Sequence, residues 1–302
     1  MAKNFSEYYL GEKIGVGAFA TVYKAYSQLQ KPTYGKVVAI KILNEKVYGE
    51  KESKVIRQFE REASIAMQLN HENVVKVYNW GKFNNRYAMI MEYIDGKNLN
   101  EYIHEPGKYG FQTLVQIGYK IACGLVHIHS HGIVHKDIKP ENVLISNDLK
   151  LVKITDFGIA KVPKRWWQRD IFDRAGSERR FSHISYAAPE QKEGNSDTRS
   201  DIYSLGVLID ELMTVKLSLP EIPGKNEQDY FRRISEVVFK YRKTMNLLSE
   251  HLPIPDEFKN ILRRTTHDQP DMRFQTATEF AYALSRFVEE DQNKQEDSDT
   301  IN

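Results

Sequence analysis

The sequence predicts an α+β fold in two lobes, a small mostly-β lobe followed by a larger mostly-α lobe. Over roughly the first ninety residues, runs of β-branched and aromatic residues alternate with glycines, as strands and turns do. From about Leu99 the apolar residues recur with a helical period. The change falls near residues 92–96, so we expect lobes at 1–92 and 97–288 joined there by a short hinge.

Bulk composition narrows the class of protein. The chain has 302 residues, 41% of them hydrophobic and 28% charged, which is enough for one large domain or two lobes. A net charge of +2 gives no reason to expect a nucleic-acid partner, and one cysteine, Cys123, allows no intramolecular disulfide. No apolar run is long enough to span a membrane, so we expect a cytoplasmic protein. The polar, acidic residues 289–302 are expected to be disordered.

The elements of the first lobe follow in order. Residues 12–28 and 36–43 have the composition of strands, and residues 73–94 predict two more strands joined through 81–85. Between them, residues 53–70 repeat apolar side chains in steps of three and four, which predicts an amphipathic helix.

The second lobe is predicted to be helical. Residues 113–132 carry an apolar stripe, and residues 200–214 are so apolar that we expect a buried helix. Residues 276–290 begin with Thr276 followed three residues later by Glu279, which is the pattern of a capping box.

A glycine-rich segment lies between the first two strand-like runs. Gly15 and Gly17 belong to GVGAFATV, a G-x-G-x-x-A pattern. A dinucleotide-binding fold would need a helix directly afterwards, but strand-like residues follow. We therefore expect a hairpin turn whose backbone N–H groups can approach phosphate oxygens, with an ordinary hairpin as the alternative.

A lysine inside an apolar strand needs a partner. Lys41 lies in the run VVAIKIL, and a buried ammonium is costly unless an acid pairs with it. Glu62 is the one carboxylate on the apolar face of the helix 53–70. We expect the two to pair, and the alternative is that Glu62 borders the stripe and is solvated.

The stretch VHKDIKPENVLI, residues 134–145, places charged side chains between apolar segments. Asp137 lies between Lys136 and Lys139, and Asn142 precedes an apolar run. A solvated turn would explain these polar residues. It would not explain why apolar residues bracket them so closely, so we expect a functional loop.

Asp156 follows a second apolar run and stands before a glycine-containing turn. Residues 143–145 and 151–154 can pair as a hairpin, which would bring Asn142 and Asp156 to the same end. A carboxylate and an amide oxygen suit a hard cation such as Mg²⁺, with Mn²⁺ as the alternative.

Seven motifs occur in order: the glycine-rich turn, VAIK, HKDIKPEN, DFG, AAPE, SDIYSLG and DMRF. On these motifs residues 8–288 resemble the eukaryotic-type Ser/Thr protein kinases, and the PEQ that ends YAAPEQ resembles bacterial members. The resemblance implies a protein kinase domain over residues 1–288, with ATP in the cleft between the lobes.

The resemblance also implies a role for each candidate residue. Asp137 would accept or orient the proton of the substrate hydroxyl, and Lys139 would reach the γ-phosphate. Lys41, steadied by Glu62, would contact the α- and β-phosphates. The expected metal ligands are Asn142 and Asp156, and the expected nucleotide-binding residues are Ile14, Gly15, Gly17, Val22, Ala39, Lys41, Met91, Glu92, Ile94 and Leu144.

Supporting residues are implied in the same way. Glu190 should pair with Arg273, and Asp201 should brace the backbone around residues 135–136. These residues would hold the site in place without taking part in the reaction.

Two departures from the family pattern bear on regulation. The arginine that usually precedes the catalytic aspartate is Lys136 here, and a lysine cannot form the bidentate contact with a phosphate. The usual Gly-Thr before the APE motif is Ser182-His183. The candidate sites of autophosphorylation, which lie near two arginines, are Ser177, Ser182 and Ser185.

We predict an ATP- and Mg²⁺-dependent kinase that phosphorylates serine or threonine in protein substrates. One alternative is a pseudokinase that binds nucleotide as a scaffold, which the departures at Lys136 and His183 favour and the intact catalytic set opposes. The other is a small-molecule kinase of related fold, but such proteins generally lack the glycine-rich turn, the lysine of KPEN and the APE element.

Overall fold

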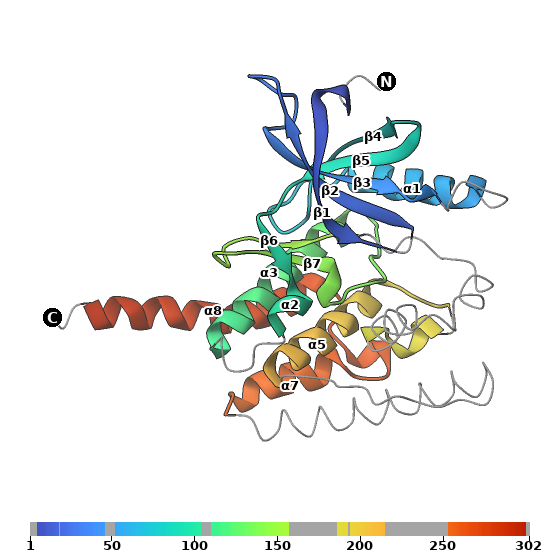
Figure 1. Cartoon of the computed structure of the whole chain (residues 1–302). Coiled ribbons are helices and arrows are strands. Elements are labelled where there is room, and N and C mark those ends of the chain that lie inside the picture. Colours follow the sequence, from blue (N-terminus) through green and yellow to red (C-terminus); the bar gives the residue numbers. More distant parts are fainter. Residues whose placement is uncertain are drawn as a thin grey trace, which may run out of the picture.

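A computed structural model describes residues 5–17, 19–45, 52–103, 110–156, 186–192, 194–214 and 253–299. These residues form two lobes, a β-sheet lobe at the top of Figure 1 and a helical lobe below it. The predicted two-lobed α+β architecture is therefore confirmed.

The upper lobe is a five-stranded antiparallel sheet in the order β1-β2-β3-β5-β4. Its strands are β1 Tyr8–Val16, β2 Ala20–Ser27, β3 Val37–Leu43, β4 Val77–Phe83 and β5 Arg86–Glu92, and the 3₁₀ helix Phe5–Glu7 precedes β1. Helix α1, Glu52–Ala66, lies beside the sheet in Figure 1.

Strand β3 shows how the sheet separates two cores. Its side chains alternate between the two faces, as a period of two requires. Val38, Ile40 and Ile42 pack with the 3₁₀ helix in a small outer core. Ala39 and Leu43 belong to the main core, which also contains buried residues of α1. Lys41 therefore lies on the face of β3 that is turned toward α1 and the second lobe.

The connection between β4 and β5 differs from the expectation. The strands extend through most of residues 81–85, and only Asn84 and Asn85 form the turn. Both have positive φ, at 47° and 62°. Asparagine tolerates this left-handed region better than other non-glycine residues, so a two-residue turn suffices and the predicted longer loop was wrong.

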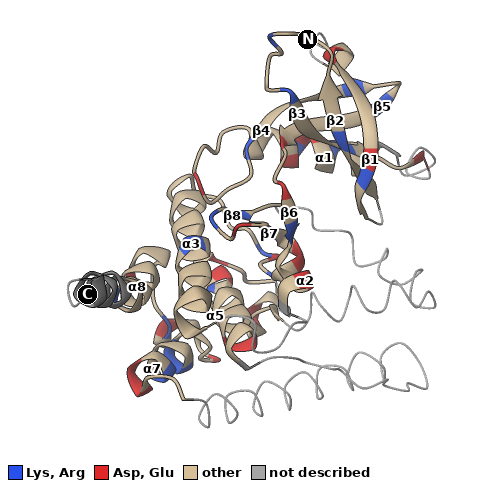
Figure 2. Ribbon diagram, turned by 60° about the vertical axis from the view of Figure 1, so that its left-hand side comes forward, with Lys and Arg blue, Asp and Glu red and all other residues tan. Residues whose placement is uncertain are grey.

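The lower lobe is built around two buried helices, α3 Phe111–Ser130 and α5 Thr198–Thr214. Figure 2 shows them side by side. The other helices are α2 Leu99–Ile103, α7 Asp256–Thr265 and α8 Ala277–Asp299, with 3₁₀ turns at Pro140–Asn142, Pro189–Lys192 and Pro270–Met272. The helices predicted at 113–132, 200–214 and 276–290 are all present.

Helix α8 begins as predicted but ends later. The Oγ1 of Thr276 accepts the Glu279 N–H at 3.1 Å, which is one half of the predicted capping box, whereas Oε2 of Glu279 accepts the N–H of Gln275 at 3.1 Å. The helix continues to Asp299, whereas we expected disorder from residue 289. The expectation of disorder rested on the polarity of residues 289–299, but five of them are Glu or Gln, which favour helix formation.

A second sheet lies between the lobes. Its strands are β6 Gly96–Asn98, β7 Val143–Ser146 and β8 Val152–Ile154, in that order. The hinge is short, because β5 ends at Glu92 and β6 begins at Gly96. A Cβ atom at Gly96 would lie 1.9 Å from the Ile145 carbonyl oxygen, so only glycine allows β6 to pair with β7 here.

Membrane crossing requires a long and apolar helix. Within the part of the chain that the structure describes, no helix has both properties.

Candidate active site

The predicted pair between Lys41 and Glu62 is present. The Lys41 Nζ lies 2.9 Å from Oε1 of Glu62, and both side chains are 14% exposed. β3 supplies the lysine on its inner face and α1 supplies the glutamate on its buried stripe. The burial of each charge is compensated by the other.

Asp156 makes a second contact with the same ammonium group. Its Oδ1 lies 2.6 Å from Lys41 Nζ, so the carboxylates of Glu62 and Asp156 share one cation. Burial alone would lower the pKa of Lys41, but the two carboxylates outweigh it and raise that pKa. Burial raises the pKa of Glu62, against the opposing influence of Lys41. We call Lys41, Glu62 and Asp156 the ion cluster.

The loop 134–145 forms a compact polar centre. The Asn142 Nδ2 donates to the carbonyl oxygen of Asp137 at 2.7 Å and to its Oδ2 at 2.8 Å. Lys139 Nζ lies 3.2 Å from the same Oδ2. One carboxylate oxygen of Asp137 is therefore held by an amide and a cation, which fixes the orientation of the acid.

Asp201 braces this loop from α5. Its fully buried carboxylate accepts the N–H groups of His135 and Lys136, each at 2.7 Å. Its Oδ2 also lies 2.9 Å from Nε2 of His129. Lys136 has a φ of +67°, an uncommon conformation for a non-glycine residue that the bracing bonds hold in place. The bracing role expected of Asp201 is thus visible in its bonds.

His135 is a packed residue. It is fully buried, and its Nε2 lies 3.2 Å from the Thr155 carbonyl oxygen. Burial lowers its pKa, although the carboxylates of Asp201 and Asp137 oppose the change. The imidazole therefore links the loop to the residue before Asp156 and stays neutral.

Asn142 and Asp156 lie at one end of the β7–β8 hairpin, as predicted. Val143 pairs with Ile154, and the Thr155 N–H donates to the Asn142 carbonyl oxygen at 2.9 Å. Because Nδ2 of Asn142 faces Asp137, its Oδ1 is directed elsewhere as an acceptor. Asp156 has a φ of +56°, a strained conformation that is typical of functional sites. An amide oxygen and a carboxylate at one end fit a hard divalent cation.

Four of the expected nucleotide-binding residues come together in the apolar core, whereas Ile14 and Ile94 are not part of it. Val22, Ala39, Met91 and Leu144 belong to one apolar cluster that spans both lobes. Strand pairing places these residues as neighbours, since Gly15 pairs with Val22 and Ala39 with Met91. The glycine-rich turn closes through a bond from the Gly17 N–H to the Ala20 carbonyl oxygen at 2.8 Å. Ile14 is 44% exposed and lies outside the cluster.

The predicted pair between Glu190 and Arg273 is bidentate. Arg273 is 1% exposed and its two terminal nitrogens lie 2.8 and 2.9 Å from the carboxylate oxygens. The guanidinium also donates to three carbonyl oxygens, of Arg199, His267 and Asp268. Ser200, which we did not predict, donates to Glu190 at 2.7 Å. The pair ties the segment 186–192 to the helical lobe.

Some expectations fall outside the described residues. The candidate phosphorylation sites Ser177, Ser182 and Ser185 lie there, as do His183 and the two residues that follow Asp156. One buried charged residue was not predicted. Lys153 is buried in β8 and pairs with Glu92. A lysine inside an apolar run was the signal that singled out Lys41, and the run LVKIT carries the same signal for Lys153.

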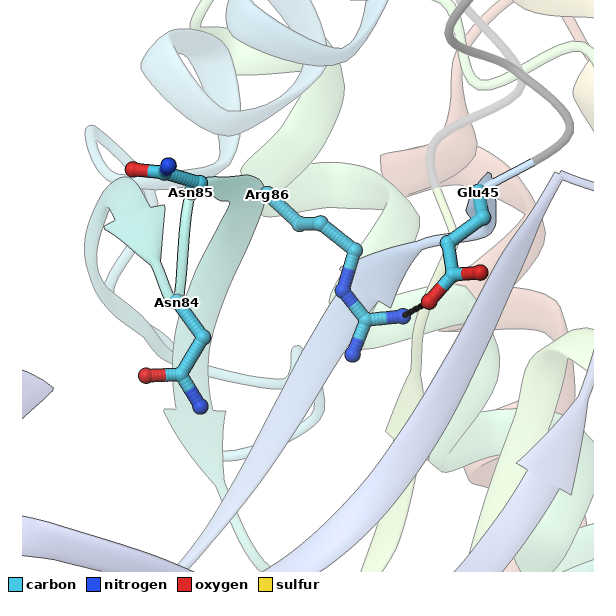
Figure 3. Close-up of a pocket in the computed structure, with 4 residues that line it drawn as sticks. All are labelled: Glu45, Asn84, Asn85 and Arg86. Atoms are coloured by element: carbon cyan, nitrogen blue, oxygen red, sulfur yellow. Dashed lines mark ion pairs between the residues drawn. The ribbon is translucent and has the colours of Figure 1, made fainter.

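A hollow of about 440 Å³ lies elsewhere, at the β4–β5 turn. Figure 3 shows Arg86 reaching toward Glu45, 3.6 Å away, with Asn84 and Asn85 beside them. Glu45 is 86% exposed, and an ion pair at such an exposed position contributes little to the stability of the fold. Lys41, Glu62 and Asp156 do not line this hollow. We therefore place the candidate active site at the ion cluster and not at the hollow.

Comparison with known proteins gives the family of the chain. The protein kinase domain model matches residues 8–283. A probable serine/threonine-protein kinase of Clostridium acetobutylicum is 33% identical over 93% of this chain and 40% of the relative. The serine/threonine-protein kinase PrkC of Bacillus subtilis is also 33% identical, over 87% of this chain and 38% of PrkC. The chain thus spans about two fifths of the length of these curated relatives.

A solved structure shows the same fold. The PknI kinase domain of Mycobacterium tuberculosis superposes with a TM-score of 0.64 at 24% identity, covering 95% of this chain and 99% of that domain. The fold and the family match point to the same class of protein. The chain belongs to the protein kinase domain family, and its relatives are bacterial serine/threonine-protein kinases.

The Glu190–Arg273 pair yields a test of stability against pH. Partial burial opposes ionisation of Glu190, but hydrogen bonds from Arg273 and Ser200 outweigh it and hold the pKa below its ordinary value of 4.5. A lowered pKa means that the pair stabilises the fold fully above pH 4.5 and loses this contribution as the pH falls through the folded-state pKa. We expect Glu190→Gln to cost about 3–5 kcal/mol at pH 7, because a buried guanidinium loses its counter-charge.

Urea unfolding of both proteins between pH 3 and pH 7 measures this effect, and the difference should shrink toward pH 3. The matched control is Glu257→Gln, because Glu257 is 55% exposed and its partner Arg286 is 57% exposed. This substitution should cost less than about 1 kcal/mol of stability. Equal stability of the Glu190 variant and the wild type at pH 7 would contradict the assignment.

Proposed function

We propose that this chain is an ATP-dependent protein serine/threonine kinase. The ion cluster carries the proposal, because it joins β3, α1 and Asp156, two residues after the end of β8, within hydrogen-bond distance. The polar centre around Asp137 lies beside it, linked through the residues that pair across the β7–β8 hairpin. Phosphoryl transfer depends mainly on positioned charges, and this arrangement supplies them.

Each side chain has a task in the proposed reaction. Asp137, held through Oδ2 by Asn142 and Lys139, orients the substrate hydroxyl and accepts its proton. The hydroxyl oxygen forms a bond to the γ-phosphorus, and the bond to the bridging oxygen of ADP breaks. Lys139 neutralises charge on the transferring phosphoryl group, while Lys41 contacts the phosphates that stay with ADP.

Asn142 and Asp156 would hold the divalent cation, for which we propose Mg²⁺ with Mn²⁺ as an alternative. When bound, the ion would neutralise negative charge on the phosphates of ATP. The Lys41 ammonium positions Asp156 through their 2.6 Å contact, so the carboxylate is oriented by the protein itself.

The adenine would bind at the hinge. Backbone groups of residues 92–94 would bind the adenine edge, apart from the Glu92 N–H, which donates to the Lys76 carbonyl oxygen, and the apolar cluster with Ala39 and Met91 would provide the walls of the pocket. Protein serine and threonine hydroxyls are the proposed acceptors, in keeping with the relatives' names. The expected cytoplasmic location and the absence of a nucleic-acid partner stay predictions.

Removal of either central acid should abolish most of the activity. We expect Asp137→Asn to lower kcat by about 10²–10⁴-fold, because the proton acceptor is lost. Asp156→Asn should lower it by about 10²–10³-fold, because a charge that serves the phosphates is lost. The measurement is transfer of labelled phosphate from ATP to a generic protein acceptor with Mg²⁺.

The matched control is Asp256→Asn, an 89% exposed acid at the start of α7, which should retain wild-type activity. Full activity of the Asp156 variant would refute the metal assignment. If the wild-type protein binds ATP but labels no protein, a pseudokinase is the better description, and labelling of small hydroxyl compounds alone would favour a small-molecule kinase.

Autophosphorylation is expected on the segment that contains Ser177, Ser182 and Ser185, because Arg179 and Arg180 are close to these serines in the sequence and arginine side chains stabilise phosphate. Mass spectrometry after incubation with ATP and Mg²⁺ should find phosphate on this peptide, and the Asp137→Asn variant should show none. An unmodified peptide from active wild-type protein would rule this out.

A further inference from the structure

Lys153 is a charged residue in the middle of a buried strand. It lies between Val152 and Ile154 in β8, and its side chain is 8% exposed. Its neighbour across the sheet is Leu144. An ammonium in such surroundings is stable only with a counter-charge, so the choice of partner is informative.

The partner is Glu92, the last residue of β5. Lys153 Nζ lies 2.9 Å from Oε2 of Glu92, whose side chain is 25% exposed. The same oxygen accepts the Lys76 N–H at 3.3 Å, and the Glu92 N–H donates to the Lys76 carbonyl oxygen at 2.8 Å. On the other side of β5, Glu92 pairs with Val38 of β3. Glu92 is therefore held by β3, by the start of β4 and by β8.

The Lys153–Glu92 pair spans the hinge. The chain leaves the upper sheet at Glu92 and enters the lower sheet at Gly96, which pairs with Ser146 of β7. β8 is the other neighbour of β7, so Lys153 reaches back from the lower sheet to the start of the hinge. Figure 2 shows β6, β7 and β8 together below the five-stranded sheet. Rotation of one lobe against the other would have to stretch this ion pair.

The same strand leads to the ion cluster. Asp156 lies three residues after Lys153 and contacts Lys41 of the upper lobe. Strand β8 and the residues directly after it thus make charged contacts with the upper lobe at two points, Lys153 at the hinge and Asp156 at the phosphate side of the proposed site.

We propose that Lys153 is a positioning residue that acts through Glu92 to set the hinge for nucleotide binding. The inference rests on the proposed function, since it assumes that the backbone of the hinge binds adenine. Lys153 touches neither the phosphates nor the acceptor. Its loss should therefore weaken nucleotide binding and leave the transfer step nearly unchanged.

A purely structural role would have another signature. Loss of one member of a buried pair destabilises the fold in either case. A structural pair, however, would lower the unfolding temperature without changing the affinity of the folded protein. Nucleotide affinity and the split between KM and kcat distinguish the two roles.

The experiment compares Lys153→Met and Glu92→Gln with the wild-type chain. Methionine keeps the length of the lysine side chain without its charge, and glutamine keeps an oxygen for the Lys76 N–H. We expect the Kd for ADP with Mg²⁺ and the KM for ATP to rise about five- to twentyfold in each variant. The value of kcat should stay within about threefold of wild type.

Two controls accompany these variants. Lys153→Arg restores a cation and should return the Kd for ADP to within about threefold of wild type. Lys150→Met removes an exposed lysine just before β8 and should change neither constant. If either single variant does not fold, the double variant Lys153→Met with Glu92→Gln decides the matter, because it leaves no unpaired charge in the buried site.

The possible results distinguish a failure of the role proposed for Lys153 from a failure of the proposed kinase function. Unchanged Kd and KM in folded Lys153→Met and Glu92→Gln would overturn the role of Lys153, whatever the activity of the wild type. A fall in kcat at constant KM would overturn it as well. Wild-type protein that neither binds ADP nor transfers phosphate would overturn the proposed function, and this inference with it.

Discussion

The arrangement of the two lobes depends on one buried cation, the ammonium group of Lys41. The ammonium of Lys41 donates hydrogen bonds to the carboxylate of Glu62 in α1 and to that of Asp156, two residues after the end of β8, and these two acids belong to different lobes. Glu62, 14% exposed, could not be buried beside an apolar core without this cation, whereas Asp156 is 45% exposed. The cost of burying Lys41 and Glu62 is offset by their mutual attraction, and the contact with Asp156 favours the arrangement of the lobes that keeps all three charges together.

The backbone supports this arrangement through the segment Asn70–Lys76, which follows α1. The Val75 N–H donates to the Ile154 carbonyl oxygen, and the Ile154 N–H donates to that of Asn73, both at 2.9 Å. Gly124 of α3 leaves room for the Asn73 carbonyl oxygen, which would lie 2.8 Å from a Cβ there. A segment of the upper lobe is thereby fixed to β8, and the position of Glu62 is coupled to that of Asp156.

Much of the ion cluster could be predicted, because the sequence patterns that point to it are local. A lysine inside VVAIKIL and a glutamate on an apolar helix face each need a partner, and the sequence offers each to the other. The two-residue turn at Asn84–Asn85 was missed because several residues there have turn character. Lys153 carried the same signal as Lys41, but its partner Glu92 is a hinge residue that shows no sequence signature of burial. The Glu190–Arg273 pair was accessible only through the family resemblance, since its members are far apart in the chain.

A double-mutant cycle tests the ion cluster most directly. If Lys41 and Glu62 act as one unit, kcat/KM for ATP should fall in Lys41→Met and in Glu62→Gln, and the double variant should be little worse than Lys41→Met alone. Losses that multiply in the double variant would mean that the two residues act independently, and would contradict the account of how the lobes are held together.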